Sequence, residues 1–167
     1  TPDNLLKMAL IYVRIQAGVP VVIMGETGCG KTSLLKYLAC KAGVYFTAVN
    51  MHAGVTLSHI VNSVEEAEKL AQDADLKVWL FWDEINTSKY CSGVLNDIVV
   101  RSKLFGKNID ERVVSVAACN PYRKRNFSRD ESAGFHHSKS NSKMSELVYH
   151  VLPLSESMLE FVWDFGR

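Results

Sequence analysis

An eight-residue stretch, GETGCGKT at 25–32, contains the residue types needed to hold a phosphate group. It fits the Walker A pattern of glycine, four residues, glycine, lysine and serine or threonine. Glycines allow backbone angles that aim several N–H groups at an anion, Lys31 would add a positive charge, and the Thr32 hydroxyl could bind Mg²⁺. The stretch predicts a nucleotide site with these cofactor-binding residues: Gly25, Glu26, Thr27, Gly28, Cys29, Gly30, Lys31, Thr32 and Ser33.

Two residues inside this stretch are not required by the pattern. Glu26 and Cys29 occupy variable positions, where only backbone atoms are needed. A redox role for Cys29 is the alternative, because the N-terminus of a helix favours a thiolate.

Two adjacent carboxylates follow an apolar run that predicts a buried strand. The run is KVWLFWDE at 77–84, and it ends in Asp83 and Glu84. In an open α/β sheet, a carboxylate at the carboxyl end of a strand lies beside the phosphate loop. Asp83 would hold Mg²⁺ through water, the Walker B role, so Thr32 and Asp83 are the predicted metal-binding residues. Glu84 would orient and polarise an attacking water; the alternative is that the two acids only cap the next helix.

A third polar side chain, Asn120, ends another apolar run, VAACNP at 116–121. Its amide would lie at the same sheet edge and could donate to the γ-phosphate or position the water. An Asn-Pro turn that only leads the chain out of the strand is the alternative. The predicted catalytic residues are therefore Glu84, Lys31 and Asn120, in a reaction in which water attacks the γ-phosphate.

Strands and helices alternate along the sequence, which predicts an α/β fold with a parallel sheet between two layers of helices. The first helix is indicated by Leu6, Leu10, Val13 and Ala17, which recur at helical spacing. Expected helices lie at 4–17, 31–42, 56–72, 88–105 and from 155 toward 163, and expected strands at 19–24, 44–50, 77–83, 112–119 and 147–152. The polar, serine-rich segment at 122–143 should be a flexible loop.

Length, net charge and cysteine content limit the kinds of protein that this sequence can encode. The chain has 167 residues, which fits one domain, and a net charge of +1, which favours neither nucleic acid nor an anionic membrane as a partner. No apolar run approaches the ~18 residues of a membrane span, and the N-terminus lacks the features of a signal peptide. The four cysteines form no CxxC pair, which indicates reduced thiols and a cytoplasmic location. The chain lacks an initial Met, and we expect it to be part of a longer one.

Several segments together resemble an AAA+ unit of the mysterin family, the giant RING-finger E3 ubiquitin ligases whose core is a dynein-like array of AAA+ modules. The segments are GETGCGKT, FWDEINTS at 81–88, AACNPYRKR at 117–125, LVYHVLPLSESM at 147–158 and FVWDFG at 161–166. The resemblance implies a three-layer P-loop NTPase fold of AAA+ type with strand order 5-1-4-3-2. It also implies that residues 1–167 are one large subdomain without its lid subdomain.

The same resemblance implies the activity: binding of ATP and Mg²⁺, hydrolysis of ATP, and a sensor-1 role for Asn120. The cycle would move or lock neighbouring AAA+ modules of the same polypeptide, which would also supply an arginine finger. Arg101, Arg112 and Arg123 could each serve a neighbour in that way, or lie on the solvated surface. The zinc-binding elements that ligase activity needs are absent from this sequence, so partners of the ubiquitin pathway would act through the parent protein.

Three other functions remain open at this point. The module could hold ATP permanently as a structural element without hydrolysing it. It could remodel nucleic acid as an AAA+ ATPase, which the near-neutral charge disfavours. A P-loop kinase is the third alternative, although Glu84 and Asn120 fit the activation of water better than transfer to a bound acceptor.

Overall fold

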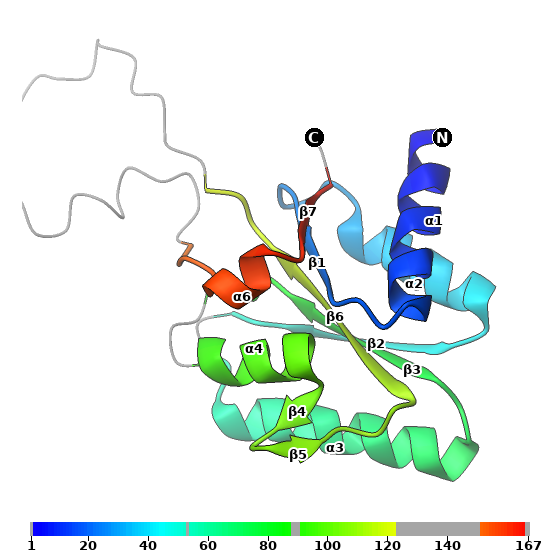
Figure 1. Cartoon of the computed structure of the whole chain (residues 1–167), viewed down its shortest axis with the longest axis vertical. Helices are drawn as coiled ribbons and strands as arrows, with labels where there is room; N and C mark the ends of the chain where they lie inside the picture. Colours follow the sequence, from blue (N-terminus) through cyan, green and yellow to red (C-terminus); the bar gives the residue numbers. More distant parts are fainter. Residues whose placement is uncertain (1, 53, 88–90, 123–150, 166–167) are drawn as a thin grey trace, which may run out of the picture.

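Five parallel strands form the centre of the computed structural model, which describes residues 2–52, 54–87, 91–122 and 151–165 (Figure 1). The order of the strands in the sheet is β2-β3-β6-β1-β7. Their bounds are β1 Val21–Met24, β2 Tyr45–Asn50, β3 Val78–Asp83, β6 Val113–Cys119 and β7 Val162–Asp164. A separate antiparallel hairpin joins β4 (Lys103–Leu104) to β5 (Lys107–Asn108). The predicted α/β class with a five-stranded parallel sheet is confirmed.

Helices cover both faces of the sheet. On one face lie α1 (Pro2–Gln16) and α2 (Lys31–Ala42), and on the other lie α3 (Leu57–Ala74), α4 (Ser92–Arg101) and the single turn α6 (Glu156–Leu159). Because both faces are covered, the strands need apolar side chains in both directions, which explains their continuous apolar runs.

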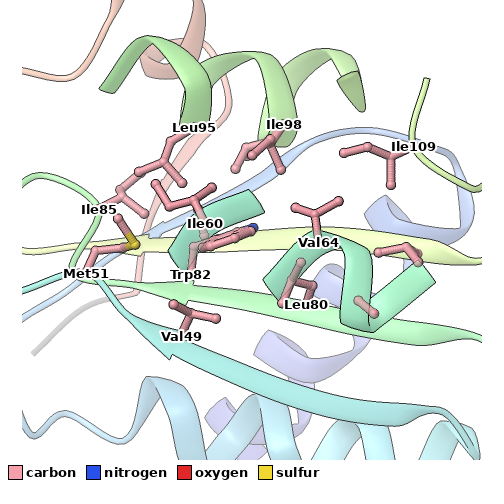
Figure 2. Packing of buried hydrophobic residues seen from close by; sticks show 14 of the residues in the cluster. Val49, Met51, Ile60, Val64, Leu80, Trp82, Ile85, Leu95, Ile98 and Ile109 are labelled. Carbon is pink, nitrogen blue, oxygen red and sulfur yellow. The ribbon is translucent and has the colours of Figure 1, made fainter. Parts of the chain in front are cut away.

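Successive residues of β3 show how one strand serves both layers. Trp79 and Phe81 pack with α1 and α2, whereas Leu80 and Trp82 pack with α3 and α4. Figure 2 shows the second group, with Trp82 beneath Ile60 of α3 and near Leu95 and Ile98 of α4. This packing on both sides fixes the carboxyl end of β3, where the two carboxylates begin.

The fifth strand differs from the expected one. Of the expected strand at 147–152, residues 147–150 lie outside the described residues, and Val151 and Leu152 are not in a strand. The strand beside β1 is β7, formed by residues for which we had expected the end of a helix. The helix from Ser155 stops at Leu159, because the run Phe161, Val162 and Trp163 contains β-branched and aromatic residues that favour a strand.

Two helices also differ from expectation. The helix expected at 88–105 comprises Ser92–Arg101 and is followed by the β4–β5 hairpin, and residues 88–90 lie outside the described part. Helix α1 is buried through Ile11 and Ile15, while Leu6 and Val13 of the apolar spacing are 61% and 63% exposed. The expected loop at 122–143 lies outside the described residues except for Tyr122.

All four cysteines of the chain are free thiols in the structure. Within the described ranges, no helix combines the length and apolar character that crossing a membrane requires.

Candidate functional site

The loop between β1 and α2 turns sharply, and two of its glycines make the turn possible. Gly28 and Gly30 have φ angles of 82° and 87°, in the left-handed region that residues with a Cβ rarely adopt. Helix α2 begins directly after Gly30, at Lys31. The first N–H groups of a helix lack partners within the helix, an arrangement suited to an anion.

Lys31 lies at the base of this loop and is only 6% exposed. Its Nζ donates to the carbonyl oxygens of Gly25 and Glu26 at 2.8 Å and 2.9 Å. The Sγ atom of Cys29 lies 3.9 Å from the same ammonium. These contacts hold the positive charge at the loop, and two of the three N–H donors of the ammonium are engaged by carbonyls.

A hydroxyl and a carboxylate meet at the start of α2, although they are 51 residues apart in the sequence. Thr32 Oγ1 donates to Asp83 Oδ2 at 2.9 Å, and Asp83 Oδ1 accepts from the main-chain N–H of Glu84 at 3.0 Å. Hard oxygen donors of this kind suit Mg²⁺, which is typically bound by one or two protein oxygens together with phosphates and water. No group of three or more His, Cys, Asp or Glu side chains that could hold a metal occurs in the described part of the chain.

Glu84 and Asn120 contact each other directly. Asn120 Nδ2 donates to Glu84 Oε1 at 3.3 Å, and Thr27 Oγ1 donates to Asn120 Oδ1 at 3.3 Å. Glu84 has a φ of 57°, a left-handed conformation that is costly for a residue with a side chain. The fold thus brings the phosphate loop and the ends of β3 and β6 into one hydrogen-bonded network.

The sequence reasoning missed two residues of this network, Asn86 and Thr87. Asn86 is 3% exposed and exchanges two hydrogen bonds with the main chain of Asn120. The Thr87 hydroxyl lies within hydrogen-bond distance of the carbonyl oxygens of Met51 and Glu84 and can donate its single proton to either. A signal was present, because Asn86 is a polar residue that follows the buried run and the apolar Ile85. Only the fold reveals which groups these side chains reach.

The residues of the loop and of the β3 end surround a cavity of about 200 Å³. Its lining comprises Thr27, Gly28, Gly30, Lys31, Thr32, Ser33, Asp83 and Glu84. The other predicted site residues do not line it. Gly25, Glu26 and Cys29 contact Lys31 from behind, and Asn120 reaches Thr27 and Glu84.

A larger cavity of about 730 Å³ lies at the opposite, amino ends of the strands. Val19, Val44, Lys77 and Val113 are among its lining residues, and none of the predicted site residues is. Arg101 lines this cavity and pairs with Asp97, while Arg112 pairs with Asp75 and Asp110. Arg123, the third arginine-finger candidate, lies outside the described residues.

Burial sets the chemistry of the thiol at the end of β6. It raises the pKa of Cys119 to about 12, although the positive charge of Lys31 acts in the opposite direction. Cys119 therefore remains a neutral thiol at physiological pH and adds no charge beside the phosphate loop.

Comparison with known proteins identifies the family of this chain. A family model described as the RNF213 AAA domain matches residues 1–123. The whole chain is 38% identical over 190 aligned residues to the E3 ubiquitin-protein ligase RNF213 of Mus musculus, and 36% identical to the protein of that name in Homo sapiens. The chain spans about 4% of the length of each of these two relatives. Midasin of Dictyostelium discoideum is 29% identical over 68 residues, which cover 41% of this chain and 1% of midasin.

Proposed function

This chain belongs to the family of RNF213 AAA domains, and on that basis we propose that it binds ATP with Mg²⁺ and hydrolyses the ATP at the γ-phosphate. One observation carries the proposal: Lys31, the Thr32–Asp83 pair and Glu84 all line the same cavity, on the concave side of the glycine loop. A site that only bound a phosphate would not need the second carboxylate.

The glycine loop and Lys31 bind the phosphates. The N–H groups at the start of α2 point toward the anion, and the Lys31 ammonium can exchange its carbonyl partners for phosphate oxygens without leaving the loop. Charge that develops on the γ-phosphate during the reaction is stabilised by these fixed donors.

Thr32 and Asp83 hold the metal. The hydroxyl is positioned to be a direct ligand, and the Asp83 carboxylate accepts from the hydroxyl and can hold a metal-bound water. A Mg²⁺ ion held by Thr32 and Asp83 would supply positive charge that offsets the negative charge of the phosphates.

Glu84 and Asn120 act on the attacking water and on the γ-phosphate. The Glu84 carboxylate would orient the water and take up its proton as the water oxygen attacks phosphorus, while the bond to the β-phosphate oxygen breaks and ADP leaves. The Asn120 amide forms hydrogen bonds with Thr27 and Glu84. From this position it could donate a hydrogen bond to the γ-phosphate when that phosphate is bound.

A second function is favoured by one feature of the same network. Glu84 Oε1 already accepts from Asn120, so this carboxylate has a partner that competes with water. If that bond persists with ATP bound, the module holds the nucleotide without turning it over. ATP would then serve as a structural link between modules.

The proposal also includes the longer protein of which this chain would be one module. The relatives are named E3 ubiquitin-protein ligases, and the chain spans only about 4% of their length. We place residues 1–167 as one AAA+ large subdomain of such a multi-module protein, in which nucleotide turnover moves or locks the neighbouring modules. An arginine finger for this cavity would come from a neighbouring module, while Arg101 and Arg112, which form ion pairs at the far end of the sheet, remain candidates to serve a neighbour's site.

The test is ATP turnover and ATP retention in the full-length protein, with wild type compared with Glu84→Gln. We expect turnover by this module to fall at least 100-fold while ATP stays bound, because the amide cannot take up a proton from water. Lys31→Ala should lose both turnover and retention, which identifies the share of the signal that belongs to this module.

The matched control is Glu65→Gln, which neutralises an exposed glutamate on α3 and should change neither quantity. Unchanged turnover in Glu84→Gln, with ATP retained through purification, would instead support the structural nucleotide holder.

A further inference from the structure

We propose that Asn86 is a positioning residue, which holds the main chain of Asn120 so that the Asn120 amide reaches Glu84 and Thr27 at once. The inference rests on the proposed function, because it concerns the same reaction. It assigns a role to a residue that does not line the nucleotide cavity.

The side chain of Asn86 is polar and yet almost completely buried. Among the described residues, the polar or charged side chains that are buried are Lys31, Asn86 and Asn120. Burying an amide is unfavourable unless its hydrogen bonds are replaced within the protein. Asn86 and Asn120 bond to each other, and Lys31 lies in the neighbouring glycine loop, so all three buried polar side chains gather at the site.

The two asparagines are joined by a pair of hydrogen bonds. Asn86 Nδ2 donates to the carbonyl oxygen of Asn120 at 2.8 Å, and the N–H of Asn120 donates to Asn86 Oδ1 at 3.1 Å. The side-chain amide of Asn86 therefore satisfies both polar main-chain groups of Asn120. A planar amide that makes two such bonds fixes the orientation of the residue as well as its position.

This pairing begins where the sheet ends. The parallel pairing of β3 with β6 runs as far as Trp82 opposite Ala117, and one further bond joins Ile85 N to the Ala118 carbonyl oxygen at 3.0 Å. The left-handed turn at Glu84 leads the chain out of the strand, so the backbone of the β3 segment can no longer pair with Asn120. The Asn86 side chain replaces the missing pairing.

A third bond holds Asn86 itself in place. The N–H of Leu152 donates to the carbonyl oxygen of Asn86 at 2.8 Å. Asn86 thus joins the end of β3, the end of β6 and the segment that precedes α6.

The hydrogen bonds of the Asn120 side chain depend on the main-chain position that Asn86 fixes. Its bonds to Glu84 and Thr27 both measure 3.3 Å, close to the limit for a hydrogen bond. A small displacement or rotation of the Asn120 main chain would break one or both of them. Errors of about 1 Å in such positions can cost about 100-fold in rate.

The experiment is a double-mutant cycle on ATP turnover in the full-length protein, with Asn86→Leu, Asn120→Ala and the double variant. Leucine removes both hydrogen bonds of the amide at similar volume. We expect Asn86→Leu to lower kcat about tenfold with KM for ATP changed less than twofold, because a buried pair of bonds is lost outside the binding cavity. The double variant should be no slower than Asn120→Ala alone, because both changes disable the same amide.

Asn62→Leu is the matched control, because Asn62 is exposed on α3, and it should leave kcat unchanged. A second double-mutant cycle uses Asn86→Asp in place of Asn86→Leu. Aspartate keeps the shape and the acceptor of Asn86 but lacks the N–H donor. If one of the two Asn86 variants does not fold, the kcat of the other variant tests the inference. Unfolding of both would overturn the inference by making Asn86 a structural residue.

The outcomes separate the two proposals. If Glu84→Gln and Asn120→Ala leave turnover unchanged, the proposed hydrolysis fails, and the role of Asn86 fails with it. If those two variants are slow but the losses from Asn86→Leu and Asn120→Ala multiply, only the inference about Asn86 is overturned.

Discussion

Asp83 uses both of its carboxylate oxygens within the site. Oδ2 accepts from Thr32, and Oδ1 accepts from the N–H of Glu84. The first bond orients the Thr32 hydroxyl toward the cavity, and the second fixes the turn that presents Glu84. A metal held by this pair would therefore depend on the hydroxyl for affinity and on the carboxylate for the shape of the loop.

Thr32→Ala should abolish the effect of Mg²⁺ on ATP binding. The variant lacks the hydroxyl ligand but keeps the loop and Lys31, so ATP affinity without Mg²⁺ should stay within about twofold, whereas affinity with Mg²⁺ should fall at least tenfold. Titration of the full-length protein with a fluorescent ATP analogue, with and without a chelator, measures both values.

Thr32→Ser is the control for that variant, because serine keeps the hydroxyl and should keep the Mg²⁺ effect. Persistence of the full effect in Thr32→Ala would contradict a role of Thr32 in holding the metal.

At the scale of elements, the loop before β6 is tied to α3 by charged groups. Arg112 Nη2 lies 2.8 Å from Asp110 Oδ2, and Arg112 Nη1 lies 3.0 Å from Oδ1 of Asp75, the C-cap residue that follows α3. The N–H of Asp110 also donates to Glu68 Oε1 of α3 at 2.8 Å. These bonds set the position at which β6 begins, and β6 carries Asn120 at its other end.

The stability contributed by Asp110 should depend on pH. Hydrogen bonds from Arg112 hold the pKa of this carboxyl well below its usual range. The folded state therefore favours the ionised form, and the resulting stabilisation is complete above the unfolded pKa of about 3.9 and is lost as the pH falls below it. We expect Asp110→Asn to lower the thermal midpoint by a constant amount between about pH 5 and pH 7, and the difference to shrink below about pH 4.

The control for this prediction is Asp97→Asn, which removes an exposed ion pair within α4 and should shift the midpoint little at any pH. A difference for Asp110→Asn that stayed constant down to pH 3 would show that the ionised carboxylate is not the source of the stabilisation.

At the scale of the whole molecule, the last described residues complete both the sheet and the support of the phosphate loop. β7 pairs with β1, and the N–H of Phe165 donates to the carbonyl oxygen of Met24 at 2.7 Å. The Cβ atom of Phe165 lies so close to Gly25 that a side chain there would approach it to 3.3 Å. The Lys7 ammonium of α1 lies 4.5 Å from the centre of the Phe165 ring. One residue thus joins β7, the phosphate loop and α1.

Phe165→Ala should reduce the free energy of unfolding by about 3–5 kcal/mol, because it removes a buried aromatic ring and leaves a cavity. Phe165 is 3% exposed, so little of this loss is offset by solvent. Urea denaturation of a folded domain that contains these residues measures the change.

Phe105→Ala is the matched control, because Phe105 is 63% exposed and its loss should change the free energy of unfolding by less than about 0.5 kcal/mol. Equal losses for the two variants would contradict the supporting role of Phe165.

The sequence by itself determined the elements that local rules control. The turn between β1 and α2 follows from its glycines, α2 from the glycines on either side of it, and the buried strands from continuous apolar runs. The meeting of Asp83 with Thr32 followed as well, because carboxyl ends of parallel strands lie at one edge of a sheet.

Only the tertiary structure decided the features that depend on distant contacts. The partner of β1 is Val162–Asp164 because its aromatic and β-branched residues pair with a strand about 140 residues earlier, a choice that no local pattern encodes. The outward direction of Leu6 and Val13 depends on which side of α1 meets α2 and the sheet. Asn86 acquires its role because the turn at Glu84 leaves Asn120 without a backbone partner, and that gap exists only once β3 and β6 have paired.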